Sequence, residues 1–498
     1  MTPSTTDPAS AFALDTLREH DAGSLRQAGR ELAPPFRLTL ADGRQLRFLR
    51  MLRLLPGRRA TGEAELDGRR VLAKLFFSAD ASRRAAREHA GIRALLGARI
   101  PTPALIFAGP LAGGGQLIAT AFLESARTLA EVAANALGDF PLPHAVSSAY
   151  PLFEGAVRLF GRLHQGGLTH DDPHLGNILL EGTRFFLIDP DTVGRAGGGP
   201  LAGPAACANL AGLIAQFPRI ETPELERLLA AYRSCSSAGF SLAQLHEAVA
   251  AARRRRLADF LGKTTRECTQ FSVRRSLRRF AASLRTQSDW LAPFLVAPDS
   301  WMPTDRLLKD GGTASVARIQ RGAHDCVLKR YNIKNRRHAF SRALRPTRAM
   351  HSWRAAHMLR FLGIPTPAPL AIVEQRLGPL RAEAWLLTKY CPGIDLLHLF
   401  ANRSDEEPGA EEGAAIRHLF HALHREGISH GDLKATNLLW DGTRLWLIDL
   451  DATRRHRSAR SHARAWTRDR ARLLRNWPAT SVLYRWLDAN LPPAGPAP

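Results

Sequence analysis

The 498-residue chain carries 69 Lys and Arg against 46 Asp and Glu, a formal net charge of +23, and 45% of its residues are hydrophobic. This composition excludes an intrinsically disordered chain and is typical of a globular protein, long enough for more than one domain. The basic excess indicates an anionic partner: nucleic acid, a phosphorylated glycolipid or an acidic membrane surface.

Cysteine spacing and hydropathy indicate the compartment. Five cysteines are scattered without CxxC spacing, which predicts neither a disulfide framework nor a zinc site. The amino-terminal residues hold Asp7, Asp15 and Glu19 and no apolar core, so we expect no signal peptide. No stretch reaches the roughly 18 to 20 apolar residues that cross a bilayer. We expect a cytoplasmic protein with peripheral contact to the inner membrane.

The first copy of an internal repeat begins after an N-terminal extension, residues 1–40, and spans 41–290 in our interpretation. Val71-Leu-Ala-Lys74 predicts an antiparallel strand. Helical spacing of apolar residues then predicts a helix over 81–96, which Ile100-Pro-Thr-Pro103 ends, and a strand over 116–122. Further helices over 205–217 and 223–233, with the basic stretch up to about Arg285, would complete a helical lobe.

The second copy, residues 291–498, repeats this order. Cys326-Val-Leu-Lys329 predicts the strand, 349–362 the helix and Ala384–Thr388 the second strand. Residues 163–177 recur as 423–437, so that His170, Asp172 and Asn177 each lie 260 positions before His430, Asp432 and Asn437. The register continues to 191 and 451, and chance does not maintain such a register.

Each repeat contains a histidine two residues before an aspartate and an asparagine five residues after it. This spacing reproduces the catalytic loop of kinases, in which the aspartate lies beside the attacking hydroxyl and the asparagine binds Mg²⁺. The predicted catalytic residues are therefore Asp172 and Asp432, and the predicted metal ligands include Asn177 and Asn437. We interpret His170 and His430 as structural.

A second acidic residue follows in each repeat, twelve positions after the asparagine. Asp189 and Asp449 end short apolar strands, where the metal-binding aspartate of a kinase lies. Asp-Pro-Asp and Asp-Leu-Asp replace the protein-kinase Asp-Phe-Gly, and this departure argues against a protein substrate.

Lys74 and Lys329 are the predicted ligands of the nucleotide phosphates. Glu88 lies twelve residues before Ile100, where a helical glutamate would orient Lys74 through an ion pair. The same count in the second copy leads to Ser352, so that site lacks this glutamate, and Glu374 is at best a substitute.

The phosphate-covering loops are short. Neither copy contains a full GxGxxG, but the second has Lys309-Asp-Gly311-Gly312-Thr-Ala-Ser315, from which Gly311, Gly312 and Ser315 are predicted to cover the phosphates. Pro56-Gly57 is all that the first copy offers. We therefore expect an α+β fold of two tandem bilobal protein-kinase-like domains, each with an antiparallel β N-lobe and a mostly helical C-lobe, using ATP and Mg²⁺.

Both halves resemble the lipopolysaccharide kinase (Kdo/WaaP) family over about residues 40–200 and 300–480. The second half is the closer match, through Ser341-Arg-Ala, Ser352-Trp353, Gly363-Ile-Pro-Thr-Pro367 and His430-Gly-Asp432-Leu-Lys-Ala-Thr-Asn437. The resemblance implies transfer of phosphate from ATP to a sugar hydroxyl, of heptose or Kdo, in the lipopolysaccharide core, an anionic glycolipid, on the cytoplasmic side of the inner membrane.

Two alternatives remain open at this point. The catalytic loop of the first copy also resembles that of the ABC1/UbiB atypical kinases, and a tandem pseudokinase could serve as a scaffold or regulator of envelope biogenesis. Nucleic-acid binding has only the charge in its favour, because no binding motif accompanies it, and we expect no specific nucleic-acid partner.

Overall fold

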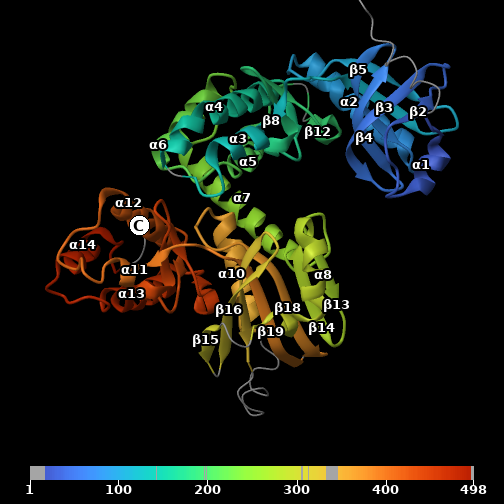
Figure 1. Cartoon of the computed structure of the whole chain (residues 1–498). Coiled ribbons are helices and arrows are strands. Elements are labelled where there is room, and N and C mark those ends of the chain that lie inside the picture. Colours follow the sequence, from blue (N-terminus) through green and yellow to red (C-terminus); the bar gives the residue numbers. More distant parts are fainter. Residues whose placement is uncertain are drawn as a thin grey trace, which may run out of the picture. The chain divides into compact units, whose positions relative to one another are not determined.

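The computed structural model describes residues 17–494 apart from 142, 196, 198, 304–306, 312, 333–345 and 379. Gly312 of the predicted phosphate-covering turn and the Ser341-Arg-Ala segment therefore lie outside the described residues. The chain forms two compact units that divide between Arg253 and Arg254, within one long helix (Figure 1).

The first unit begins with a seven-stranded sheet and continues with helices and short strands. Its elements before residue 122 are β1 (Glu19–His20), α1 (Ala22–Ala28), β2 (Phe36–Thr39), β3 (Gln45–Leu55), β4 (Arg59–Leu66), β5 (Arg69–Phe76), α2 (Ala81–Gly97), β6 (Leu105–Pro110) and β7 (Gln116–Ala121). Those that follow are β8 (Arg127–Thr128), α3 (Leu129–Leu137), α4 (Pro143–Gln165), β9 (Leu168–His170), η2 (Leu175–Asn177), β10 (Ile178–Glu181), β11 (Arg184–Leu187), η3 (Pro190–Thr192), β12 (Val193–Arg195), α5 (Gly203–Ile214), α6 (Thr222–Arg233) and α7 (Leu242–Lys263).

Separate hydrophobic cores stabilise the sheet and the helical part of this unit. Alternate residues of β2 to β5 face one side of the sheet, where Phe36 and Phe48 stack with ring centroids 4.8 Å apart. In the helical part, α4 supplies Phe153 and Phe160 to a second core, which also contains the buried side chains of α5 and α6. The catalytic loop thus rests on a packed helical layer while the strand bearing Lys74 belongs to the sheet.

The second unit has the same order of a seven-stranded sheet followed by a helical part. The elements of its sheet region are β13 (Phe271–Arg275), β14 (Arg279–Leu284), η4 (Arg285–Gln287), α8 (Ser288–Val296), η5 (Pro298–Trp301), β15 (Leu307–Gly311), β16 (Ala314–Arg321), β17 (His324–Tyr331), α10 (Arg348–Phe361), β18 (Pro369–Leu377) and β19 (Leu380–Lys389). The helical part contains β20 (Ile394–Asp395), α11 (Leu396–Leu399), α12 (Ala410–Arg425), β21 (Ile428–Ser429), η6 (Ala435–Asn437), β22 (Leu438–Trp440), β23 (Leu445–Leu447), η7 (Leu450–Ala452), β24 (Arg454–Arg455), α13 (Ala459–Leu474) and α14 (Val482–Asn490).

The two sheets share five strands in one spatial order and differ at their edges. The order is β1-β2-β3-β4-β5-β7-β6 in the first unit and β13-β14-β18-β19-β17-β16-β15 in the second. Thus β3, β4, β5, β7 and β6 correspond to β15, β16, β17, β19 and β18. The first sheet is extended by β1 and β2 beside β3, and the second by the β13–β14 hairpin beside β18. Neighbouring strands are antiparallel except β1 and β2.

The observed boundaries differ from those expected from the sequence. Residues from Glu19 to Thr39 form part of the first sheet and its flanking helix, whereas the sequence placed them in an extension. The basic stretch before Arg285 does not complete the first helical lobe, because Phe280 and its neighbours in β14 pair with β18. No helix among the described residues is long and apolar enough to cross a membrane.

Candidate active sites

A buried histidine positions the predicted catalytic loop of the first unit. His170 ends β9, and its Nε2 lies 3.1 Å from the carbonyl oxygen of Ile188, so this nitrogen carries the proton and donates. Asn177 Nδ2 donates to the carbonyl oxygen of Asp172 at 3.0 Å and lies 3.3 Å from its Oδ2. The loop is therefore tied to the strand that precedes Asp189, as the structural interpretation of His170 requires.

The second unit repeats these contacts. His430 Nε2 donates to the carbonyl oxygen of Ile448 at 2.9 Å, and Asn437 Nδ2 donates to that of Asp432 at 2.9 Å. With its amide nitrogen so used, Asn437 presents Oδ1, a suitable ligand for Mg²⁺, to the other side.

The second acidic residue of each unit has an unusual backbone conformation. Asp189 and Asp449 follow β11 and β23 with φ of 60° and 58°, in the left-handed region. Non-glycine residues seldom adopt this region, and those that do are often found at functional sites. Here the conformation directs each carboxylate toward the lysine of the sheet.

In the first unit, the expected pair of Lys74 and Glu88 is present. Lys74 Nζ lies 2.5 Å from Glu88 Oε1 and 3.0 Å from Asp189 Oδ1. Burial disfavours the ammonium, but the two carboxylates outweigh this and hold the pKa of Lys74 above its ordinary value. Burial likewise opposes ionisation of Asp189, but Lys74 prevails and holds the pKa of Asp189 below its ordinary value. Three groups distant in sequence thus converge.

The first site also contains carboxylate oxygens suited to a cation. Glu88, Asp189 and Asp191 each offer an oxygen, and the three oxygens lie within 4.8 Å of one another. Glu88 Oε2 and Asp191 Oδ1 are buried and have no hydrogen-bond donor among the described residues. Burial raises the pKa of Glu88, although Lys74 opposes this effect. Mg²⁺ takes oxygen ligands and would supply a partner for these two carboxylate oxygens, so the residues present fit the ion.

In the second unit, Asp451 takes the place of the missing glutamate. Lys329 Nζ lies 2.5 Å from Asp449 Oδ1 and 2.8 Å from Asp451 Oδ2. Ser352, at the helix position of Glu88, donates through Oγ to Asp451 Oδ1 at 2.6 Å. Glu374 does not substitute, because it is buried in β18 and contacts Thr347 and Arg376.

Asp451 is held by further groups. Tyr331 donates to its Oδ1 at 2.7 Å, and Arg348 Nη2 lies 2.6 Å from its Oδ2. Burial opposes its ionisation, yet Lys329 and the hydroxyls of Ser352 and Tyr331 lower the pKa of Asp451 to about 2. In the sequence, Asp451 stands out only as part of the repeat; the absence of a glutamate at position 352 was the available signal for its role.

The two aspartates predicted to be catalytic, Asp172 and Asp432, have different surroundings. Asp432 pairs with Lys434 Nζ at 2.9 Å and with Arg472 Nη1 at 3.0 Å. The positions 260 residues earlier hold His174 and a glycine, and no lysine or arginine of the described residues pairs with Asp172. Only the second unit therefore surrounds this carboxylate with positive charge.

A polar residue that contacts the backbone of each predicted catalytic loop was not identified from the sequence. Asp469 of α13 accepts from the backbone amides of His430 and Gly431 at 2.6 and 3.0 Å. In the first unit Asn209 of α5 donates to the carbonyl oxygen of His170 at 2.8 Å. These residues are also 260 positions apart, so extending the repeat past Asp451 would have identified them.

The predicted phosphate-covering turn joins β15 and β16. Ser315 is buried, and its Oγ accepts from Asn332 Nδ2 at 3.3 Å; the same nitrogen lies 3.5 Å from the carbonyl oxygen of Gly311. Asn332, which the sequence analysis missed, thus braces the turn. The corresponding β3–β4 turn of the first unit contains Gly57 at φ 69°.

Comparison with known proteins matches the second unit to a family model. The model described as lipopolysaccharide kinase (Kdo/WaaP) family matches residues 303–488. The 3-deoxy-D-manno-octulosonic acid kinase of Xylella fastidiosa (strain 9a5c) is 30% identical over 190 residues, which cover 36% of this chain and 73% of that protein. The protein of the same name from Stenotrophomonas maltophilia (strain R551-3) is 33% identical over 168 residues, covering 32% and 64%. The solved structure "WaaP in complex with acyl carrier protein" is 21% identical, with a TM-score of 0.32 over 41% of this chain and 86% of that one.

Proposed function

We propose that this chain phosphorylates a sugar hydroxyl of the lipopolysaccharide core. The premise is that the chain belongs to the lipopolysaccharide kinase (Kdo/WaaP) family and is a kinase. The relatives act, by their names, on 3-deoxy-D-manno-octulosonic acid. Heptose is the second candidate sugar, as the resemblance in sequence implied. Peripheral contact with an anionic membrane surface is part of the proposal, because the net charge of +23 favours it.

The second unit carries the transfer in this proposal. The supporting observation is the positive charge around Asp432, where Lys434 and Arg472 both pair with the carboxylate. Asp432 would orient the acceptor hydroxyl and accept its proton, while Lys434 would stabilise charge on the phosphoryl group in transit. The family model covers this unit, which agrees with the assignment.

ATP and Mg²⁺ are the proposed co-substrate and metal. Lys329, anchored by two carboxylates, would bind the nucleotide phosphates, and Asn437 Oδ1 and Asp449 would hold the metal. The metal, when bound, would neutralise charge on the transferred phosphoryl group. Gly311 and Ser315 would present the β15–β16 turn to the phosphates, an assignment supported by the bracing at Asn332.

For the first unit we propose a second kinase-like domain that binds nucleotide without transfer. Lys74, Glu88 and Asp189 would bind the phosphates and metal together with Asn177, since the ion pairs needed for this are present. Its loop lacks the lysine beside Asp172, and His174 instead accepts from the amide of Gly176 at 2.9 Å. This second candidate function restricts the pseudokinase alternative, which the sequence left open for both units, to the first unit alone.

Transfer of labelled γ-phosphate from Mg-ATP to lipopolysaccharide from a strain lacking the protein tests the assignment. Asp432→Asn is expected to lower the rate at least about 100-fold, the usual effect of losing an acid–base group, and Asp172→Asn to leave it within twofold. Loss in Asp172→Asn alone would make the first unit the working one. Nucleotide binding without transfer by the wild type would instead favour a scaffold.

A further inference from the structure

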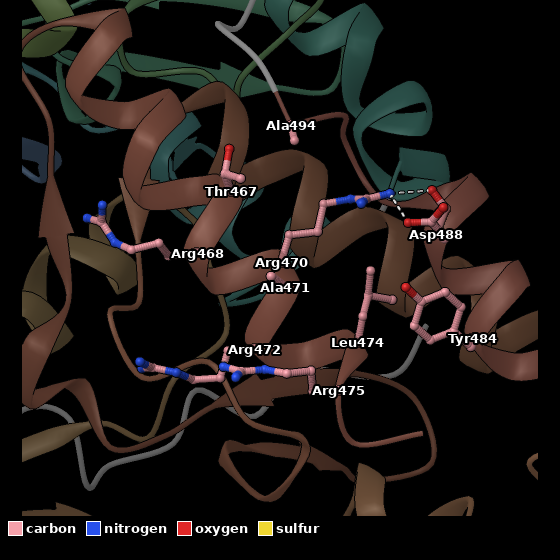
Figure 2. A pocket seen from close by; sticks show the side chains of 10 residues that line it. All are labelled: Thr467, Arg468, Arg470, Ala471, Arg472, Leu474, Arg475, Tyr484, Asp488 and Ala494. Atoms are coloured by element: carbon pink, nitrogen blue, oxygen red, sulfur yellow. Dashed lines mark hydrogen bonds and ion pairs between the residues drawn. The ribbon is translucent and has the colours of Figure 1, made fainter. Parts of the chain in front are cut away.

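A basic pocket lies beside the catalytic loop of the second unit. It has a volume of about 550 Å³ and is bounded by α13, α14 and the residues that follow them. Figure 2 shows its lining side chains: Thr467, Arg468, Arg470, Ala471, Arg472, Leu474, Arg475, Tyr484, Asp488 and Ala494. Neither Lys329 nor Asp449 lines it, so it is separate from the ion pairs assigned to the nucleotide.

The pocket has more positive charge than the protein neutralises. Arg470 pairs with Asp488 at 2.6 Å, and Arg472 pairs with Asp432. The side chains of Arg468 and Arg475 form no hydrogen bond or ion pair with any residue that the structure describes. In the view of Figure 2, the guanidinium groups of Arg468, Arg472 and Arg475 extend to the same side, away from the pair formed by Arg470.

A helix end alone accounts for only part of this arrangement. Cations near a helix C-terminus are favourable, and this explains Arg472 on the last turn of α13 and Arg475 at its C-cap. It does not explain Arg468 farther back, or a cavity that all of these residues share. Uncompensated arginines around one concave surface are suited to an oxyanion, which guanidinium groups bind through paired hydrogen bonds.

Arg472 connects the pocket to the transfer site. Its Nη1 donates to the carbonyl oxygen of Gly431 at 2.6 Å and to Asp432 Oδ1 at 3.0 Å, while the side chain also lines the pocket. An oxyanion in the pocket would therefore be separated from the catalytic carboxylate by a single guanidinium. A hydroxyl at Asp432 and an anion at Arg472 fit one sugar or two linked sugars, against which the partly buried ring of Tyr484 offers apolar surface.

We propose that this pocket binds an oxyanionic group, phosphate or carboxylate, that the acceptor carries on the phosphorylated sugar or its neighbour. The inference rests on the proposed function and deepens it by naming the acceptor class. The enzyme selects acceptors that are already negatively charged near the reacting hydroxyl, and Arg475 with Arg468 supplies that selection.

Two matched variants of α13 test the pocket in the full-length protein. Arg475→Gln removes an unpaired pocket arginine, and Arg464→Gln removes an exposed, unpaired arginine of the same helix that does not line the pocket. With deacylated core oligosaccharide as acceptor, Arg475→Gln is expected to raise KM about tenfold with kcat unchanged, since a charged hydrogen bond is lost. Arg464→Gln is expected to retain the wild-type KM.

Chemical treatment of the acceptor distinguishes the sources of the oxyanion. The acceptor is treated in two ways: its phosphates are removed, or its carboxylates are reduced to alcohols. One of these treatments is expected to raise the KM of the wild type about tenfold. The same treatment should not raise the KM of Arg475→Gln any further. Equal effects of Arg475→Gln and Arg464→Gln, or no effect of either treatment, would overturn the proposal. So would inhibition by inorganic phosphate that does not compete with the acceptor, which would indicate a separate effector site.

Failure of the proposed function can be distinguished from failure of the pocket proposal. If the wild type transfers no phosphate, calorimetric titration of the same oligosaccharide, treated and untreated, measures the pocket directly. Tenfold tighter binding of the untreated oligosaccharide by wild type, lost in Arg475→Gln and retained in Arg464→Gln, supports the pocket. Equal binding by all three proteins refutes it.

Discussion

Asp451→Asn tests the substitution of an aspartate for the missing helix glutamate. Asp451 neutralises Lys329 and Arg348 and accepts from Tyr331 and Ser352. Asparagine keeps the shape and can still accept from the hydroxyls, but it removes the charge. Breaking a buried ion pair costs about 3–5 kcal/mol. The cost here is lower, because Lys329 keeps its second carboxylate and Arg348 is one-third exposed, and we expect about 2 kcal/mol.

The assay follows from the tryptophan distribution, since all nine tryptophans lie in the second unit. Urea unfolding followed by tryptophan fluorescence reports that unit, and its free energy of unfolding is expected to fall by about 2 kcal/mol. If the same energy holds Lys329 in its productive position, kcat/KM for ATP falls about 30-fold. An Asp451→Asn protein with wild-type stability and wild-type kcat/KM would refute the reasoning.

Two comparisons separate charge from packing. Asp191 is the counterpart of Asp451 at the 260-residue spacing, but its ion pair is a loose one with Arg59 at 3.9 Å. Asp191→Asn is therefore expected to change the stability of the first unit by less than about 0.5 kcal/mol. Adding Ser352→Glu to Asp451→Asn restores a carboxylate at the helix position of Glu88, and we expect partial recovery of both losses.

Two further variants test the packing of each unit. His357 is buried against aromatic rings, and this burial lowers the pKa of His357 to about 3. Below the ordinary pKa of 6.5, the unfolded chain therefore binds a proton at His357 that the folded chain does not bind. The stability of the second unit should thus fall by about 2 kcal/mol between pH 7.5 and 5, and His357→Leu should reduce this dependence in tryptophan-monitored unfolding. Gly91→Ala should stabilise α2 by about 1 kcal/mol by helix propensity alone. Its Cβ would lie 1.8 Å from the carbonyl oxygen of Pro190, however, and we expect the free energy of unfolding of the first unit to fall by about 2 kcal/mol. Circular dichroism measures this loss, while the tryptophan fluorescence transition of the second unit should not change. A stabilised Gly91→Ala variant would contradict the expectation.

Much of each site could be predicted because its chemistry is encoded over short stretches. The loop from His430 to Asn437 holds its own geometry, so spacing alone indicated which side chains project together. The lysines were recognised as the last residues of short apolar strands, and Glu88 by its place twelve residues before Ile100 in the predicted helix. The mixed sheet-and-helix fold followed from the order of these elements. The roles assigned to these residues stay predictions that the transfer assays test.

Other features required the tertiary structure, because they join residues far apart in the chain. Asp451 meets Lys329 across 122 positions, and Arg472 reaches Asp432 across 40. The β13–β14 hairpin, which the sequence placed in the first domain, joins the second sheet through β18. The sequence by itself determined the repeat and the identity of the reactive groups, since these depend on local spacing. Strand partners and ion-pair partners were decided only in the folded chain, because propensity and spacing do not specify which distant surface a residue will meet.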